Sequence, residues 1–173
     1  MKNLFTLFLS LSLSSLSHAG ALNDAFGDGV FGVSWGATLQ EVKNIHPGGD
    51  IDTYGAITHY SIEDGRSLLN VERDEDETLI FAFTGNPQRL TAIGANFGGS
   101  QYTEVLYALQ GAFGPTDSTP GASSSGSALW PVDEGIKMYL SIVPSGFSTS
   151  TSLTIENVNP NKDFDKGSMG FNE

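Results

Sequence analysis

The sequence predicts an α+β fold, in which an antiparallel sheet carries two short helices packed on one face. Two observations lead to this prediction. Several short runs rich in β-branched and aromatic residues are separated by Gly, Pro and Asp turns, as is typical of antiparallel strands. Two other segments instead carry apolar residues at helical spacing. Helices that lie between blocks of antiparallel strands favour the α+β class.

The first helix is predicted to follow a loose, glycine-rich lead-in over residues 20–29. Thr38 is a candidate N-cap, and the apolar residues of segment 39–45 fall on one helix face. The sequence His-Pro-Gly-Gly at 46–49 ends this helix. Residues 50–55 are predicted to form a loop.

The remaining elements are predicted as two blocks of strands with a second helix between them. The first block holds strands at 56–62, 67–73, 78–84 and 89–97, and the helix covers 102–113. Gly114-Pro115 ends the helix, a Ser/Gly-rich loop follows, and the second block holds strands at 128–132, 135–143 and 152–158. Because each block follows a helix, the layout suggests a degenerate tandem repeat of a helix and its strands.

The amino terminus predicts a cleavable secretory signal peptide over residues 1–19. Lys2 supplies the positive charge, residues 4–16 form the apolar stretch, and Ser17-His18-Ala19 places small residues at the cleavage site. The apolar stretch is too short to span a bilayer. We therefore expect a periplasmic or secreted protein, cleaved near Ala19, with a single domain over 20–158 and a polar, disordered tail over 159–173.

The composition excludes several classes of function. The chain has a formal net charge of −12 at pH 7, so it repels phosphate backbones and we expect no nucleic-acid partner. It contains no cysteine, which rules out disulfides and leaves too few ligands for a structural zinc site. No transmembrane segment, no metal and no cofactor are expected.

Two glycine motifs suggest catalysis or nucleotide binding, but their contexts do not fit. Residues 27–32 match G-x-G-x-x-G, although no strand precedes them as dinucleotide binding requires. Residues 32–36 match G-x-S-x-G, which would make Ser34 a nucleophile with His46 or His59 as its base. The alternating strands and helices of such hydrolases are missing, so we predict that the protein is not an enzyme and keep a serine hydrolase as the least favoured alternative.

Acidic segments leave open a calcium-binding alternative. Asn161, Asp163, Asp165 and Gly167 resemble part of an EF-hand loop, but the glycine comes one position late. Residues 74–77 form a second acidic cluster, and such clusters are usually solvated turns. Small-molecule or calcium binding is the second function to consider.

Three aromatic residues are candidates for a recognition surface, namely Trp35, Tyr102 and Trp130. Aromatic side chains are enriched where proteins bind one another. The alternative for each of them is packing in the core.

The residues at the two helix starts resemble a known family. Residues 36–42 (Gly-Ala-Thr-Leu-Gln-Glu-Val) and 103–106 (Thr-Glu-Val-Leu), with Gly114-Pro115 and the strand bearing Trp130, resemble the SmpA/OmlA-type outer-membrane assembly lipoproteins and the related β-lactamase inhibitor proteins. In these proteins a helix leads into three antiparallel strands, and the inhibitors repeat this unit in tandem. The resemblance implies binding to another protein, and the missing lipid-bearing cysteine departs from the lipoprotein pattern. The leading hypothesis is therefore a non-catalytic domain that binds another envelope or exported protein.

Overall fold

The main element of the fold is a seven-stranded antiparallel sheet. The computed structural model describes residues 20–117, 127–145 and 148–159, and it confirms the predicted α+β class. The strands follow one another across the sheet in the order β3 (Asp50–Tyr54), β4 (Ile57–Glu63), β5 (Thr78–Thr84), β6 (Arg89–Gly98), β9 (Ser148–Asn157), β8 (Ile136–Ser145) and β7 (Ser127–Leu129).

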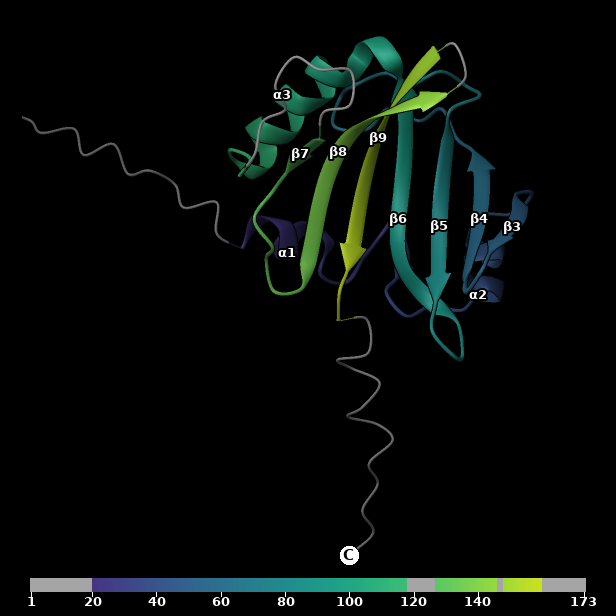
Figure 1. Cartoon of the computed structure of the whole chain (residues 1–173). Helices are drawn as coiled ribbons and strands as arrows, with labels where there is room; N and C mark the ends of the chain where they lie inside the picture. Colours follow the sequence, from purple (N-terminus) through teal and green to yellow (C-terminus); the bar gives the residue numbers. More distant parts are fainter. Residues whose placement is uncertain (1–19, 118–126, 146–147, 160–173) are drawn as a thin grey trace, which may run out of the picture.

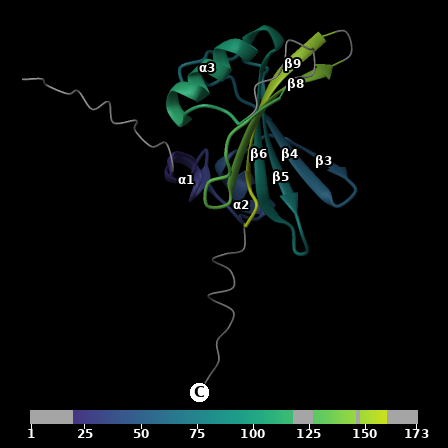
Figure 2. The same cartoon turned by 60° about the vertical axis from the view of Figure 1, so that its left-hand side comes forward.

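The helices lie on one face of this sheet, and no other described element covers the opposite face, which we call the uncovered face (Figures 1 and 2). They are α1 (Ala21–Phe26), α2 (Leu39–Ile45) and α3 (Tyr102–Phe113), the last preceded by the 3-10 turn η1 (Gly99–Gln101). A two-stranded ribbon of β1 (Gly29–Val30) and β2 (Val33–Ser34) joins α1 to α2.

The core forms between the helices and the covered face of the sheet. In the inner strand β5, Leu79, Phe81 and Phe83 are fully buried, whereas the residues between them are only partly buried. Val105 and Leu109 of α3 pack against the same core. The alternation of strand side chains thus sends every second residue into the core and the others to the uncovered face.

The two predicted helices are confirmed, each with its expected end signal. The Thr38 side chain accepts a hydrogen bond from the Glu41 backbone N–H at 3.2 Å, and the Glu41 carboxylate accepts one from the Thr38 N–H at 2.7 Å. This reciprocal pair is a capping box. Helix α3 ends at Gly114, whose φ of 84° lies in the left-handed region that favours glycine.

The structure corrects three local predictions. Residues 50–54, predicted as a loop, form β3, which pairs with β4. Residues 67–73, predicted as a strand, instead form a tight turn, in which Leu69 and Asn70 adopt positive φ angles and only Leu68 and Val71 form an isolated bridge. Residues 20–29, predicted as a loose lead-in, contain helix α1, whose Leu22 is buried in the core.

The two blocks of strands meet at the centre of the sheet. The last strand of the first block, β6, pairs with the last strand of the second block, β9, and the first strands, β3 and β7, form the two edges. This mirrored order keeps the layout on which the tandem repeat was suggested. The repeat itself stays a prediction.

Three predicted segments lie wholly or mostly outside the described residues, namely the signal peptide at 1–19, the Ser/Gly-rich loop over 118–126, and all of the predicted tail except Asn159. Within the described part of the chain, no helix is long and apolar enough to cross a membrane.

Candidate binding surface

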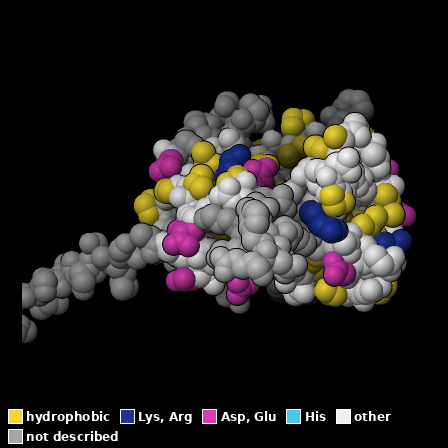
Figure 3. Space-filling view, turned by 90° about the horizontal axis from the view of Figure 1, so that it is seen from below, with side chains coloured by type: hydrophobic (Ala, Val, Ile, Leu, Met, Phe, Trp, Pro, Cys, Tyr) yellow, Lys and Arg dark blue, Asp and Glu magenta, His cyan; other side chains and the backbone are white. Residues whose placement is uncertain are grey.

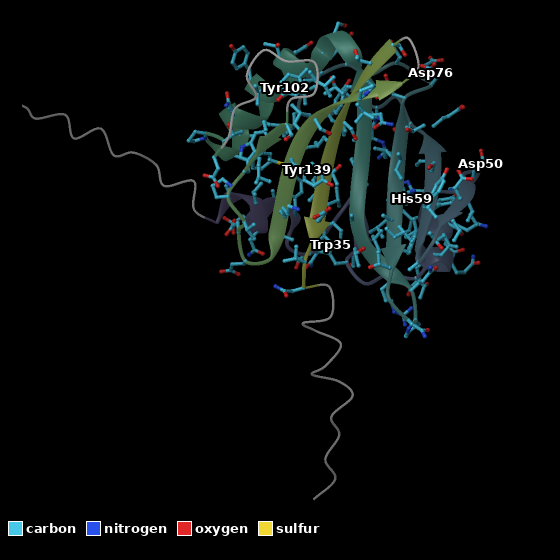
Figure 4. All side chains as sticks on the ribbon, in the orientation of Figure 1. Trp35, Asp50, His59, Asp76, Tyr102 and Tyr139 are labelled. Atoms are coloured by element: carbon cyan, nitrogen blue, oxygen red, sulfur yellow. The ribbon has the colours of Figure 1, made fainter. Side chains whose placement is uncertain are left out.

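Of the three aromatic residues predicted to form a recognition surface, Trp35 and Tyr102 lie far apart (Figure 4). Trp130 is fully buried, and its indole Nε1–H donates to the Gly114 carbonyl at 3.0 Å. A side chain in this position packs the core and offers no surface to a partner, so we leave it out of the candidate surface.

Trp35 and Tyr102 are both partly buried, near opposite ends of the molecule. The Trp35 Nε1–H donates to the Phe26 carbonyl at 2.6 Å, which holds the indole against the core. The Tyr102 hydroxyl is buried and has no hydrogen-bond partner among the described residues, and burial raises the pKa of this tyrosine. Both residues pack against the core, and neither lines a surface on the uncovered face of the sheet.

The serine of the G-x-S-x-G motif is not assembled with a histidine base. Within the described residues, exposed Ser34 forms no hydrogen bond to His46 or His59. The buried His46 ring pairs through Nε2 with the Phe31 carbonyl at 2.9 Å and packs on Phe81. His59 belongs to β4, where it alternates with the buried Tyr60 and therefore faces the uncovered side.

The acidic segments give no metal cluster in the described part of the chain, where no three His, Asp or Glu side chains are gathered as ligands. The cluster at 74–77 is a turn before β5, and burial raises the pKa of Glu77 within it. The segment resembling an EF-hand, at 161–167, lies outside the described residues.

Seen from the lower end of the molecule, acidic, basic and hydrophobic side chains are interspersed (Figure 3).

The most distinctive surface is a hollow of about 570 Å³ on the uncovered face of the sheet. The side chains at the floor of the hollow are small. They belong to Ala82 on β5 and to Ala92 on β6, next to Gly94, which has no side chain. A bulge between β5 and β6 at Ala82 and Phe83 places Thr91 as an extra residue in the ladder. Bulges increase the local twist and bend of a strand, which helps to curve the sheet around the hollow.

One side of the hollow is formed by a linked group of polar side chains on β8 and β9. The Tyr139 hydroxyl donates to Glu156 Oε1 at 3.0 Å, and Lys137 Nζ pairs with Glu156 Oε2 at 3.2 Å. The Lys137 ammonium also lies 5.2 Å from the centre of the Tyr139 ring. Burial raises the pKa of Tyr139, and the charge of Glu156 raises it as well. The phenol therefore stays protonated near neutral pH and is held in one orientation by Glu156.

The other side of the hollow is formed by β4, and the edge strand β3 extends the same face of the sheet beyond it. His59 and Ile57 line the hollow, and the Tyr54 ring lies 5.7 Å from the His59 ring, measured between centres. Asp50 and Asp52 pair with Ser61 and His59 across the ladder and therefore share this face. Figure 4 shows His59 and Tyr139 on strands at opposite sides of the hollow.

Sequence reasoning did not identify this surface, although part of the signal is present in the chain. In β4, β5 and β9, buried residues alternate with more exposed ones, and the more exposed residues form this surface. The sequence does not indicate which strands become neighbours, and Tyr139 and His59 come close to one hollow only because β6 pairs with β9.

Comparisons with protein-family models, with curated proteins and with solved structures give no match to this chain. The family resemblance described above therefore stays a prediction from the sequence.

Proposed function

We propose that the protein is a non-catalytic binding domain that holds another exported or envelope protein against the uncovered face of its sheet. The observation that carries the proposal is the hollow between Tyr139 and His59. Sheets normally bury one face on the core and solvate the other with polar side chains. Here the second face is curved, and small apolar residues lie at its centre, so a convex surface can approach the backbone closely.

The charges around the hollow favour a basic partner. Asp50 and Asp52 lie on the same face of the sheet, on β3 next to the strand that bears His59, and the whole chain carries a net charge of −12. Lys137, on the opposite side, is already paired with Glu156. A partner with Lys or Arg near its contact surface would be attracted, and such charge complementarity mainly increases specificity and the association rate.

The arrangement of aromatic residues supports a protein partner. Tyr139 lines the hollow and Tyr54 lies next to His59 on the neighbouring edge strand, and tyrosine is enriched at the energetic centres of protein interfaces. The family resemblance implies the same kind of function, binding to another protein. The signal peptide predicted at 1–19 would place the encounter in the periplasm or outside the cell.

The proposal is tested by filling the hollow. The Gly94 backbone has room for a side chain, since an added Cβ would make only ordinary contacts, the nearest being Ile80 Cβ at 3.7 Å. Gly94→Arg would block the hollow and repel a basic partner. Gly111→Arg is the matched control, because Gly111 lies on α3, where an added Cβ meets nothing within 4 Å.

The measurement is affinity capture from the periplasm of the native host, with and without crosslinker, using tagged wild-type protein and both variants. We expect one stoichiometric protein to be captured by the wild type and by Gly111→Arg, and to be lost with Gly94→Arg. Equal capture by all three proteins would overturn the assignment of the surface. Capture of no protein by any of them, even after crosslinking, would overturn the proposed function.

A small ligand is the second candidate, because a volume of about 570 Å³ lies within the usual range for small-molecule sites. The hollow is open along the sheet, whereas such sites enclose most of the ligand surface. A metabolite that raises the melting temperature of the wild type and of Gly111→Arg, but not that of Gly94→Arg, would favour this function.

A further inference from the structure

The edge strand β3 has an unpaired side. It pairs with β4 along its whole length, and no other described strand lies against it. Its outer backbone N–H and C=O groups are therefore available to another extended chain. The opposite edge, β7, is shorter, with three residues, and its Ala128 is fully buried.

Three large apolar side chains are exposed on β3 and the adjoining start of β4. Every residue of β3 is exposed, including Ile51 at 47% and Tyr54 at 65%, and Ile57 on β4 is 39% exposed. These three residues belong to one hairpin, which holds one third of the nine large hydrophobic residues exposed in the described part of the chain. Tyr54 and Ile57 are partners across the ladder, and adjacent exposed apolar residues indicate an interaction site more than isolated ones do.

The charges of β3 select among the strands that could pair with it. Asp50 and Asp52 share the uncovered face of the sheet, and Ile51 lies on the opposite face. A second copy of β3 paired about its centre would place Asp52 opposite Asp52, and like charges directly opposite are destabilising. A segment with Lys or Arg at alternate positions and an apolar residue between them would match both faces.

We propose that β3 accepts an extended, basic segment of a partner protein as an eighth strand of the sheet. Main-chain hydrogen bonds would supply affinity, while Asp50, Asp52 and Ile51 would select the sequence, as in other cases of strand addition. This inference goes beyond the proposed function, because it uses the edge of the sheet and stands even if the hollow binds nothing.

The test uses a synthetic peptide with the central sequence Lys-Val-Lys-Val-Lys and a matched peptide in which Glu replaces each Lys. Both are titrated into the isotope-labelled exported protein, and backbone amide NMR signals and hydrogen exchange are followed. We expect the lysine peptide to shift the signals of residues 50–54 and to slow their exchange at least five-fold. Binding should weaken as salt is added.

Variants separate strand addition from general attraction to an acidic protein. The double substitution Asp50→Asn with Asp52→Asn should weaken binding of the lysine peptide at least five-fold. Asp74→Asn with Asp76→Asn removes the same charge elsewhere and should have little effect, as should Gly94→Arg. Equal weakening by the two Asp-to-Asn pairs, shifts centred on the hollow, or no binding at about 1 mM peptide, a very weak affinity, would each overturn the proposal.

Discussion

The Arg73 side chain holds in place the irregular segment between β4 and β5, which has no regular secondary structure of its own. Its guanidinium is buried and donates to backbone carbonyls of Asn96 at 2.8 Å and Thr78 at 2.9 Å, and also to that of Asp64. The charged group also lies 5.4 Å from the centre of the Phe97 ring. Burial lowers the pKa of Arg73, but the guanidinium stays charged at neutral pH. The irregular segment between β4 and β5 is thereby tied to β6.

Replacing this guanidinium should destabilise the fold. We expect Arg73→Met to lower the free energy of unfolding by about 2–4 kcal/mol, because several carbonyls would lose their charged donor. Urea denaturation of the protein without residues 1–19, at neutral pH, measures the change. Arg66→Met is the matched control: Arg66 pairs with Asp64 at the surface, with 52% of its side chain exposed, and should cost less than about 1 kcal/mol. Equal losses in both variants would contradict the role given to Arg73.

The same segment shows why the sequence misled at the scale of single residues. Residues 67–73 contain Leu, Val and Arg at alternating positions, which predicts a strand. The alternation has another cause, since Val71 is buried in the core and Arg73 is held by carbonyls from other parts of the chain. An alternating pattern indicates that side chains two residues apart are buried. It does not indicate that another strand lies beside the segment and pairs with its backbone.

Among the elements, those with their own end signals were predictable. Helix α2 begins at the capping box of Thr38 and Glu41, and α3 ends at Gly114-Pro115; both signals are local. Strand β3 was not predicted, because its residues are all exposed and carry two aspartates, which are rare in strands. Residues 50–54 become a strand because the turn at Gly55 folds them back onto β4, with which they pair. That pairing cannot be seen in the local sequence.

The cap of α2 offers a test at this scale. We expect Thr38→Ala to lower the free energy of unfolding by about 1 kcal/mol, since the Glu41 N–H would lose its acceptor at the helix start. Thermal denaturation followed by circular dichroism measures this loss. Ser34→Ala, at an exposed serine in the preceding ribbon, is the control and should leave the midpoint unchanged. A Thr38→Ala protein as stable as the wild type would show that the capping box adds nothing.

At the scale of the whole molecule, the sequence was informative about class and composition and silent about the surface. The α+β fold followed from local patterns. The hollow depends on which strands become neighbours and on which sheet face the helices cover. Ala82, Ala92 and Gly94 become the floor of a hollow only when β5 and β6 lie at the centre of an uncovered face.

The predicted export has a direct test at the amino terminus. Helix α1 begins at Ala21, and the Asn23 N–H donates to Asp133 Oδ2 at 2.9 Å, so the chain is packed almost directly after Ala19. We expect the full chain, expressed in a Gram-negative bacterium, to be recovered from the periplasm with Gly20 as its first residue. Intact mass measurement of the periplasmic protein checks this. A cytoplasmic product that retains residues 1–19 would contradict the signal peptide.

The pairing of β6 with β9 also has a consequence for the order in which the chain folds. The hairpins β3–β4 and β5–β6 join neighbouring segments, whereas the central pair joins Ala92 to Glu156 across the rest of the second block. Helix α1 likewise contacts β8, and its Phe26 packs against Phe113 of α3. Contacts between distant segments form slowly. A chain threaded through a membrane from its amino terminus could thus form early hairpins but would complete its core only after β9 had crossed.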